Sequence, residues 1–348
     1  MSIFPFNTSS AAVRRLTPVA LLGLALLSSC SDDDDSPAAP AAPAVVIFTQ
    51  AGLYPEGVQY DAPNSRFLVT SLTTGQVGQV DDDGTYSPAF TNTTGLVSAI
   101  GLYLDNAQGR NRVLVAVSDP GANQQRTSMT TLNKLARLAI YNNANASAAP
   151  TIVELGTLRP NANHFANDVA VDNSGNAYVT DSFSGIIYKV DATTNAASVF
   201  VESPQFAAPA GAFGLNGIVF HPDGYLLAVK SDEGKLFKIP LAAPATFTTV
   251  ATTQNLTAAD GLLLQDNNTL QVVSNAQARV FRLATTNAFG AATLAGSFTT
   301  AAQFPTTLAR RDGASYVLYA NLDVLFGMRM PAPTQPISEY SINRVSFQ

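Results

Sequence analysis

Short runs of alternating apolar and polar residues recur along most of the chain, separated by Gly, Asn, Asp and Ser. The stretch from His164 to Asp191 shows the pattern clearly. An Asn-Asp pair enters one run, and an Asn-Ser-Gly turn and a Ser-Gly turn separate two further runs. Runs of this length, rich in Val, Ile and Tyr and bounded by turn-forming residues, are typical of antiparallel strands joined by tight turns. The stretch therefore predicts a three-stranded meander.

The same frame of three runs and two turns returns along the chain. Its first runs begin at residues 57, 101, 168, 217, 261 and 307, at intervals of 44, 67, 49, 44 and 46 residues, and the longest interval holds an insertion between Ser118 and Lys134. Four-stranded propeller blades repeat every ~40 to 50 residues. A variable stretch after the third run fits a fourth, outer strand. We predict an all-β fold, a six-bladed β-propeller over residues 45–348, rather than paired β-sandwiches or a β-helix.

The run from Ala44 to Thr49 precedes the first segment and has no turn of its own. A ring of sheets needs a closure, because an unpaired strand edge invites aggregation. We therefore predict that this run adds a strand to the last blade, which is built from residues 307–348.

The first thirty residues read as a targeting signal. Arg14 and Arg15 precede an apolar run from Leu16 to Leu27 that is too short to span a bilayer comfortably, and small residues lead up to Cys30. Leu-Ser-Ser before Cys30 resembles the lipobox of bacterial lipoproteins. The resemblance implies removal of residues 1–29 and lipidation of Cys30; an ordinary secretory signal is the alternative.

Residues 30–44 contain four consecutive aspartates and a Pro/Ala-rich run, a composition that cannot bury a core and predicts a disordered tether. The acidic run after the cysteine also resembles the surface-export signals of Bacteroidota lipoproteins. We expect a domain held at the bacterial cell envelope, at the outer membrane and facing the surface, that touches the membrane only through its lipid.

Cysteine usage and charge exclude several classes of protein. Cys30 is the only cysteine, so the fold contains no intramolecular disulfide, thiol nucleophile or thiolate metal cluster. The formal net charge is -6, and residues 44–348 keep -4 of it once Arg14, Arg15 and Asp32 to Asp35 are set aside. Such a domain lacks the basic face that a nucleic-acid partner requires. A small-molecule substrate is the expected partner, and no protein partner is identified.

One residue of each segment stands just before its first run. The innermost strands of a propeller run roughly along the central channel, so these residues should meet at one mouth of it. They are Glu56, Ile100, Asn167, Asn216, Asp260 and Thr306. Two carboxylates and two carboxamides are oxygen ligands that suit a hard cation such as Ca²⁺. The chain has no thiolate in the fold and two histidines, which disfavours zinc or copper.

The motifs around four of these residues are Tyr54-Pro-Glu-Gly, Ala166-Asn-Asp-Val, Leu215-Asn-Gly-Ile and Ala259-Asp-Gly-Leu. In this order and spacing they resemble the metal-site motifs of the calcium-dependent propeller hydrolases. That superfamily includes the senescence marker protein/gluconolactonase family, diisopropyl fluorophosphatase and the paraoxonases. The resemblance implies that Glu56, Asn167, Asn216 and Asp260 line a Ca²⁺ site. It also implies hydrolysis of a lactone, ester or phosphotriester, with Asp260 as base or nucleophile.

The chain departs from this family where the substrate would bind. Sugar-acid lactonases carry an arginine two residues before the Asn-Asp pair, where this chain has Phe165. His164 lies three residues before Asn167, and we predict a catalytic role for it, with a plain loop histidine as the alternative. His221, in His-Pro-Asp-Gly, is predicted to be a turn residue.

Two further predictions concern the surroundings of the mouth. The insertion between Ser118 and Lys134 is long enough to cover one end of the channel as a lid or contact loop. The alternative to hydrolysis is a non-catalytic surface propeller with a structural Ca²⁺ that binds a glycan, peptide or partner protein.

Overall fold

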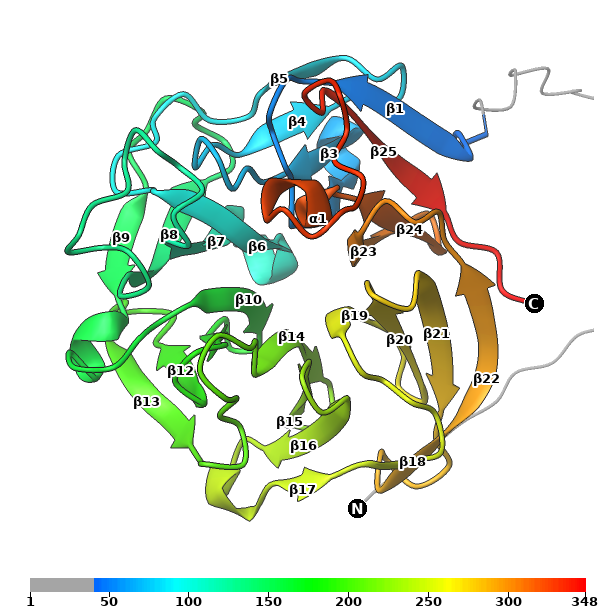
Figure 1. Cartoon of the computed structure of the whole chain (residues 1–348). Coiled ribbons are helices and arrows are strands. Elements are labelled where there is room, and N and C mark those ends of the chain that lie inside the picture. Colours follow the sequence, from blue (N-terminus) through cyan, green and yellow to red (C-terminus); the bar gives the residue numbers. More distant parts are fainter. Residues whose placement is uncertain (1–40) are drawn as a thin grey trace, which may run out of the picture. The chain divides into compact units, whose positions relative to one another are not determined.

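Six small sheets form a ring around a central axis in the computed structural model, which describes residues 41–348 (Figure 1). The predicted all-β fold, a six-bladed β-propeller, is thereby confirmed. The predicted signal peptide 1–29, the lipidation site Cys30 and the tether up to residue 40 lie outside the described residues. No helix within residues 41–348 is long and apolar enough to cross a membrane.

Blades one to three follow the chain from the innermost strand outward. Blade one contains β2 (Val58–Asp61), β3 (Arg66–Val69), β4 (Gly78–Val80) and β5 (Tyr86–Pro88). Blade two contains β6 (Ser98–Asp105), β7 (Arg112–Ser118), β8 (Ala136–Asn142) and β9 (Thr151–Glu154). Blade three contains β10 (Ala166–Val171), β11 (Ala177–Asp181), β12 (Ile186–Val190) and β13 (Ala197–Glu202).

Blades four and five follow the same plan, and blade five gains an extra outer strand. Blade four contains β14 (Leu215–His221), β15 (Tyr225–Lys230), β16 (Lys235–Pro240) and β17 (Thr248–Thr249). Blade five contains β19 (Ala259–Asp266), β20 (Thr269–Ser274), β21 (Arg279–Ala284), β22 (Ala291–Thr299) and, parallel to the last, β18 (Ala251–Thr252).

Blade six combines both ends of the described chain. It contains β23 (Pro305–Arg311), β24 (Ala314–Tyr319), β25 (Glu339–Arg344) and β1 (Val45–Thr49). The helical pieces are short: α1 (Leu322–Leu325) and 3-10 turns at Ala62–Asn64, Ala107–Gly109, Gly156–Leu158 and Pro244–Thr246.

The hydrophobic core lies between neighbouring blades. One buried cluster joins blades three and four through Tyr178, Ile187, Leu226 and Phe237. Similar clusters join the other neighbours. Alternation in the inner and middle strands is weaker than in a sheet with one wet face, because each blade is covered on both faces by its neighbours.

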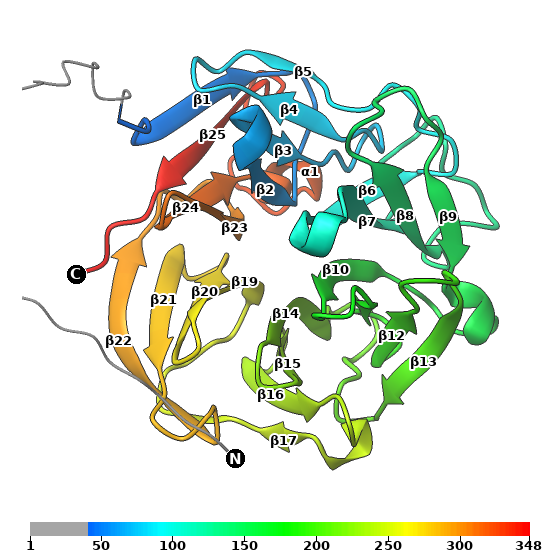
Figure 2. The ribbon, with the colours of Figure 1, turned by 180° about the vertical axis from the view of Figure 1, so that it is seen from behind.

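The predicted closure is confirmed. β1 pairs with β25 in antiparallel register from Val45 opposite Asn343 to Thr49 opposite Glu339, and the two strands lie side by side in both views (Figures 1 and 2). Phe48 is buried against the blade-six core, whereas Ile47, which precedes it in the strand, is 54% exposed. The strand therefore has one buried face and one face in water.

The insertion between β7 and β8 folds back on the rim of its own blade and the preceding loop. Asp119 accepts hydrogen bonds from the Thr127 and Thr131 hydroxyls, both at 2.6 Å, and Asn123 donates to the Val97 carbonyl at 2.6 Å. Side chains of this kind commonly replace regular secondary structure as the partners of loop backbone.

If β1 holds the ring closed through its buried face, Phe48→Ala should lower the free energy of unfolding by about 3 to 5 kcal/mol. Ile47→Ala, on the wet face of the same strand, should change it by less than about 1 kcal/mol. Urea denaturation of the two variants beside the parent protein measures both values. Equal losses for the two substitutions would contradict the one-sided packing of the strand.

Candidate functional site

The inner strands of five blades enter their sheets through an irregularity. In β10 the register with β11 shifts between Ala166 and Val169, and β6, β14, β19 and β23 show the same shift at the corresponding place. A bulge of this kind releases residues from ladder pairing and re-aims their side chains. The released positions include five of the six residues predicted to meet at the mouth: Ile100, Asn167, Asn216, Asp260 and Thr306.

Hydroxyl groups hold these entries in place and tie each blade to the next. The Thr180 hydroxyl oxygen accepts the backbone N–H of Asp168 at 3.1 Å, and its hydrogen is donated to the Asn216 carbonyl of blade four at 2.7 Å. The Thr306 hydroxyl donates to the Glu56 carbonyl at 2.7 Å and links blade six to blade one. Backbone groups freed from the ladder are thus satisfied, as buried polar groups need to be.

The structure brings the four predicted metal ligands together. Glu56, Asn167, Asn216 and Asp260, from four different blades, line one cavity of about 370 Å³ at a mouth of the ring. Ile100 lines it as well. Each of the four polar residues is less than one-tenth exposed.

Hydrogen bonds orient the two carboxamides in this cavity. Asn167 donates its Nδ2 hydrogen to Ser182 Oγ at 2.9 Å, and Asn216 donates likewise to Ser231 Oγ at 3.0 Å. Because each amide nitrogen is committed to a serine, the amide oxygen on the other side is available to a further partner.

Three acceptor atoms at this site receive no hydrogen bond. Asp232 Oδ1 is one of them; the other two, Glu56 Oε2 and Asn167 Oδ1, belong to predicted metal ligands. An unpaired buried carboxylate oxygen is costly, because it has lost water and gained nothing in exchange. A hard cation held by carboxylate and amide oxygens would satisfy both atoms, so the residues present fit Ca²⁺.

The donor set relies on amide oxygens as much as on carboxylates. Within residues 41–348, no three His, Cys, Asp or Glu side chains gather into a compact ligand group. The histidines and thiolates that zinc and copper prefer are therefore not offered here.

Burial and mutual repulsion disturb the carboxyl groups. Burial raises the pKa of Glu56 well above its usual range, and the negative charges of Asp260 and Asp168 raise it further. Burial also raises the pKa of Asp260 to about 7, against the opposing hydrogen bond from Asn275 Nδ2 at 3.0 Å. Both shifts mark a place where positive charge would be favourable.

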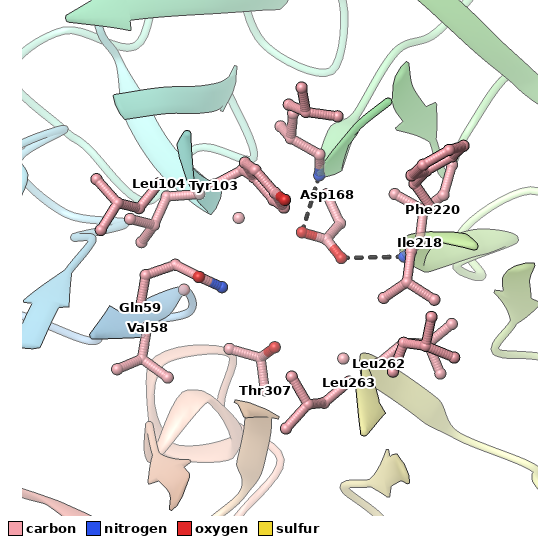
Figure 3. A pocket seen from close by; sticks show the side chains of 18 of the residues that line it. Val58, Gln59, Tyr103, Leu104, Asp168, Ile218, Phe220, Leu262, Leu263 and Thr307 are labelled. Carbon is pink, nitrogen blue, oxygen red and sulfur yellow. Dashed lines mark hydrogen bonds between the residues drawn. The ribbon is translucent and has the colours of Figure 1, made fainter. Parts of the chain in front are cut away.

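Asp168 is the site residue that sequence reasoning missed. Its two carboxylate oxygens accept the N–H groups of Val169 at 2.8 Å and Ile218 at 3.0 Å, and burial raises its pKa to about 6. It lines a second cavity of about 270 Å³, into which its carboxylate points (Figure 3). Glu56 and Asn216 line both cavities and so lie between them. The sequence could have indicated Asp168 through its position directly after Asn167 in the Asn-Asp pair.

Aromatic rings form the wall above the polar groups. Phe165, two residues before Asn167, lines the larger cavity together with Phe213. Their ring centroids are 5.1 Å apart and nearly perpendicular, and Phe183 packs 5.4 Å from Phe165 behind them. Edge-to-face packing of this kind holds large apolar rings in fixed positions.

The cavity is covered by the connection between β24 and β25. Leu322 and Phe326, in and after α1, and the nearby Met328 line the cavity. The insertion between Ser118 and Lys134, which was predicted to form a lid, contributes no lining residue to either cavity. Its side chains are instead engaged at the rim of blade two.

The structure does not bring His164 to either cavity. Its Nδ1 lies 2.7 Å from Asp181 Oδ2 and its Nε2 lies 2.9 Å from the Arg159 carbonyl oxygen, and the side chain is buried. Asp181 also accepts the Tyr188 hydroxyl at 3.0 Å. With both ring nitrogens engaged in this way, His164 fixes the loop before β10, and the arrangement gives its predicted catalytic role no support.

His221 ends β14 at a turn. Its Nδ1 accepts the N–H of Asp223 at 3.1 Å, its Nε2 lies 2.8 Å from the Asn267 carbonyl oxygen, and its ring stacks on Tyr225. It is not among the residues that line either cavity.

Comparison with known proteins identifies the fold. No protein-family model and no curated protein sequence matches the chain. Among solved structures, the major allergen of Malassezia sympodialis has a TM-score of 0.67 at 16% identity, covering 88% of this chain and 97% of its own. A protein classed with the gluconolactonases has a TM-score of 0.57 at 15% identity, covering 88% and 94%. A streptogramin B lyase has a TM-score of 0.54 at 11% identity, covering 86% and 97%. These similarities establish a shared propeller fold.

Proposed function

We propose that the protein is a Ca²⁺-dependent hydrolase of a lactone, ester or phosphotriester that acts in the larger cavity. The observation that carries the proposal is the pair of buried acceptors without partners, Glu56 Oε2 and Asn167 Oδ1, in a cavity that Asn216 and Asp260 also line. Stability alone gives no reason to bury such atoms, which points to a ligand.

Glu56, Asn167, Asn216 and Asp260 would hold the cation. When bound, Ca²⁺ would polarise the carbonyl or phosphoryl oxygen of a substrate as a Lewis acid. Hydrogen bonds to Ser182 and Ser231 fix the orientation of the Asn167 and Asn216 carboxamides. Their oxygen atoms are therefore in place before a cation binds.

Asp260 is the residue proposed to act on the substrate. Its carboxylate is buried and lines the cavity beside the other three predicted ligands. It can take the proton of an attacking water or attack the substrate directly. Asn275, which donates to Asp260 Oδ2, fixes the orientation of the carboxylate.

The fold supports this chemistry by analogy. It is shared with a protein classed with the gluconolactonases and with a streptogramin B lyase, which is consistent with an enzyme on this fold. The analogy supports the class of reaction. It does not identify the substrate, which depends on the residues that line the cavity.

If these residues hold Ca²⁺, Glu56→Gln should weaken its affinity by at least about tenfold, since a charged ligand becomes neutral. The affinity of the parent protein should fall as the pH is lowered from 8 to 6, a window set by the pKa of about 7 of Asp260, because protons then compete with the cation. Isothermal titration calorimetry measures both effects. Glu154→Gln, at the exposed rim of blade two, is the matched control. Unchanged affinity in the Glu56 variant would remove the basis of the site.

If Asp260 acts on the substrate, Asp260→Asn should reduce hydrolysis of a lactone and aryl-ester panel by at least about 100-fold, since the substitution removes the base. A chelator should abolish the activity of the parent protein. Asp266→Asn, at the exposed outer end of the same strand, should leave rates unchanged. Ca²⁺ binding without turnover on any member of the panel would favour the alternative, a non-catalytic propeller with a structural Ca²⁺.

We also propose that Cys30 carries a lipid and that the domain is anchored at the outer membrane through it alone. The support is the Leu-Ser-Ser-Cys signal and the acidic run after it. Metabolic labelling with a fatty acid and detergent phase partition should both be positive for the parent chain and negative for Cys30→Ser. Labelling that survives this substitution would refute the anchor.

A further inference from the structure

The larger cavity offers no positively charged side chain to a ligand. Its ionisable lining residues are Glu56, Asp232 and Asp260, and no Lys, Arg or His of the described chain is among them. Lys230 lies nearby but is buried and committed, with its Nζ 3.4 Å from Asp232 Oδ2 and in contact with Glu233. The charge of Lys230 is therefore shared between Asp232 and Glu233 and is not offered to a ligand in the cavity.

A divalent cation would balance the charges of the predicted ligands, because Glu56 and Asp260 contribute two negative charges. Asp232 shares Lys230 with Glu233. Asp168 adds a further carboxylate beside Glu56 and Asp260. The occupied cavity would then hold no excess of positive charge. An anionic group on a ligand would be desolvated in it without a counter-charge of its own, which is strongly unfavourable.

Most of the remaining lining residues are apolar, and the other polar ones are Ser231, Thr257 and Asn275. Phe165 is 4% exposed at the inner end, whereas Phe326 and Met328 are 40% and 56% exposed at the outer end. Phe213 and Phe304 line the wall as well. A large apolar body on a ligand can therefore be covered along its length, and the gain increases with the area buried.

Phe165 is held firmly enough to act as a specificity residue. Its backbone N–H donates to Asp181 Oδ1 at 2.9 Å, and Phe183 and Phe213 pack against its ring. Only Ala166 separates it from Asn167 in the chain, and both residues line the larger cavity.

We propose that this cavity selects neutral ligands with an aromatic or branched apolar body and rejects their anionic analogues, with Phe165, Phe213 and Phe326 as the specificity-determining wall. The inference rests on the proposed function for the location of the reacting group. It adds the chemical class of the substrate: a neutral aryl or alkyl ester or lactone rather than a sugar acid.

Binding of non-hydrolysable ketones tests the selection separately from catalysis. In the presence of CaCl₂, the protein should bind neutral 4-methylacetophenone at least about tenfold more tightly than anionic 4-acetylbenzoate, measured by NMR titration, because only the second carries an uncompensated charge. Similar affinity for the two ketones, or no detectable binding of the neutral one, would overturn the proposal.

Two arginine substitutions test the wall itself. Phe165→Arg should reverse the preference by supplying a counter-charge. Phe326 is partly exposed at the edge of the cavity, where an arginine need not disturb folding. Phe326→Arg should reduce the ratio of the affinities for the neutral and the anionic ketone at least about threefold. Met129→Arg, on the 93% exposed tip of the insertion, should have no effect and controls for added charge. A preference that persists unchanged in Phe326→Arg would exclude this wall as its source.

Turnover of the corresponding esters separates this inference from the proposed function. Selective ketone binding without turnover of any ester would refute hydrolysis and leave the selectivity standing. Turnover of neutral and anionic esters at similar efficiency would refute the selectivity and leave hydrolysis standing.

Discussion

The pairing of β1 with β25 is the constraint on which the rest of the structure depends. A propeller blade buries both faces against its neighbours, so an open ring would expose two faces and two strand edges at once. The strand from the start of the described domain completes the sheet at its end and removes that exposure. Once the ring is closed, the six inner strands are held around a single axis, and residues far apart in the chain are brought together there.

The entries of the inner strands turn this ring into a site. Each bulge removes residues from the ladder at the same height, and hydroxyls such as those of Thr180 and Thr306 satisfy the freed backbone groups across blade boundaries. The polar side chains are therefore placed by the hydrogen-bonded entries of the inner strands. These bonds keep Glu56 and Asn167 buried with acceptor atoms that nothing in the described part of the chain satisfies.

Two kinds of surface meet in the larger cavity. Its base carries carboxyl groups whose pKa values are raised by burial and further by neighbouring negative charges, and its wall carries phenylalanines. The low dielectric of this wall strengthens the attraction between the carboxylates at the base and a cation. The combination favours a cation at the base and an uncharged apolar molecule above it, which is why the metal proposal and the ligand proposal support each other.

The sequence by itself determined the repeats, the number of blades and the closing strand, because each of these follows from local alternation and from its regular return. Of the six residues that it predicted at the mouth, five line one cavity and Thr306 does not. Only the tertiary structure decided what surrounds them. The cover is formed by Leu322, Phe326 and Met328 rather than by the longer insertion, and His164 is engaged by Asp181 and the Arg159 carbonyl, away from both cavities. Asp168 joins the channel from beside Asn167. These outcomes depend on how loops and side chains from different blades pack across the ring, and such long-range contacts leave no period in the sequence.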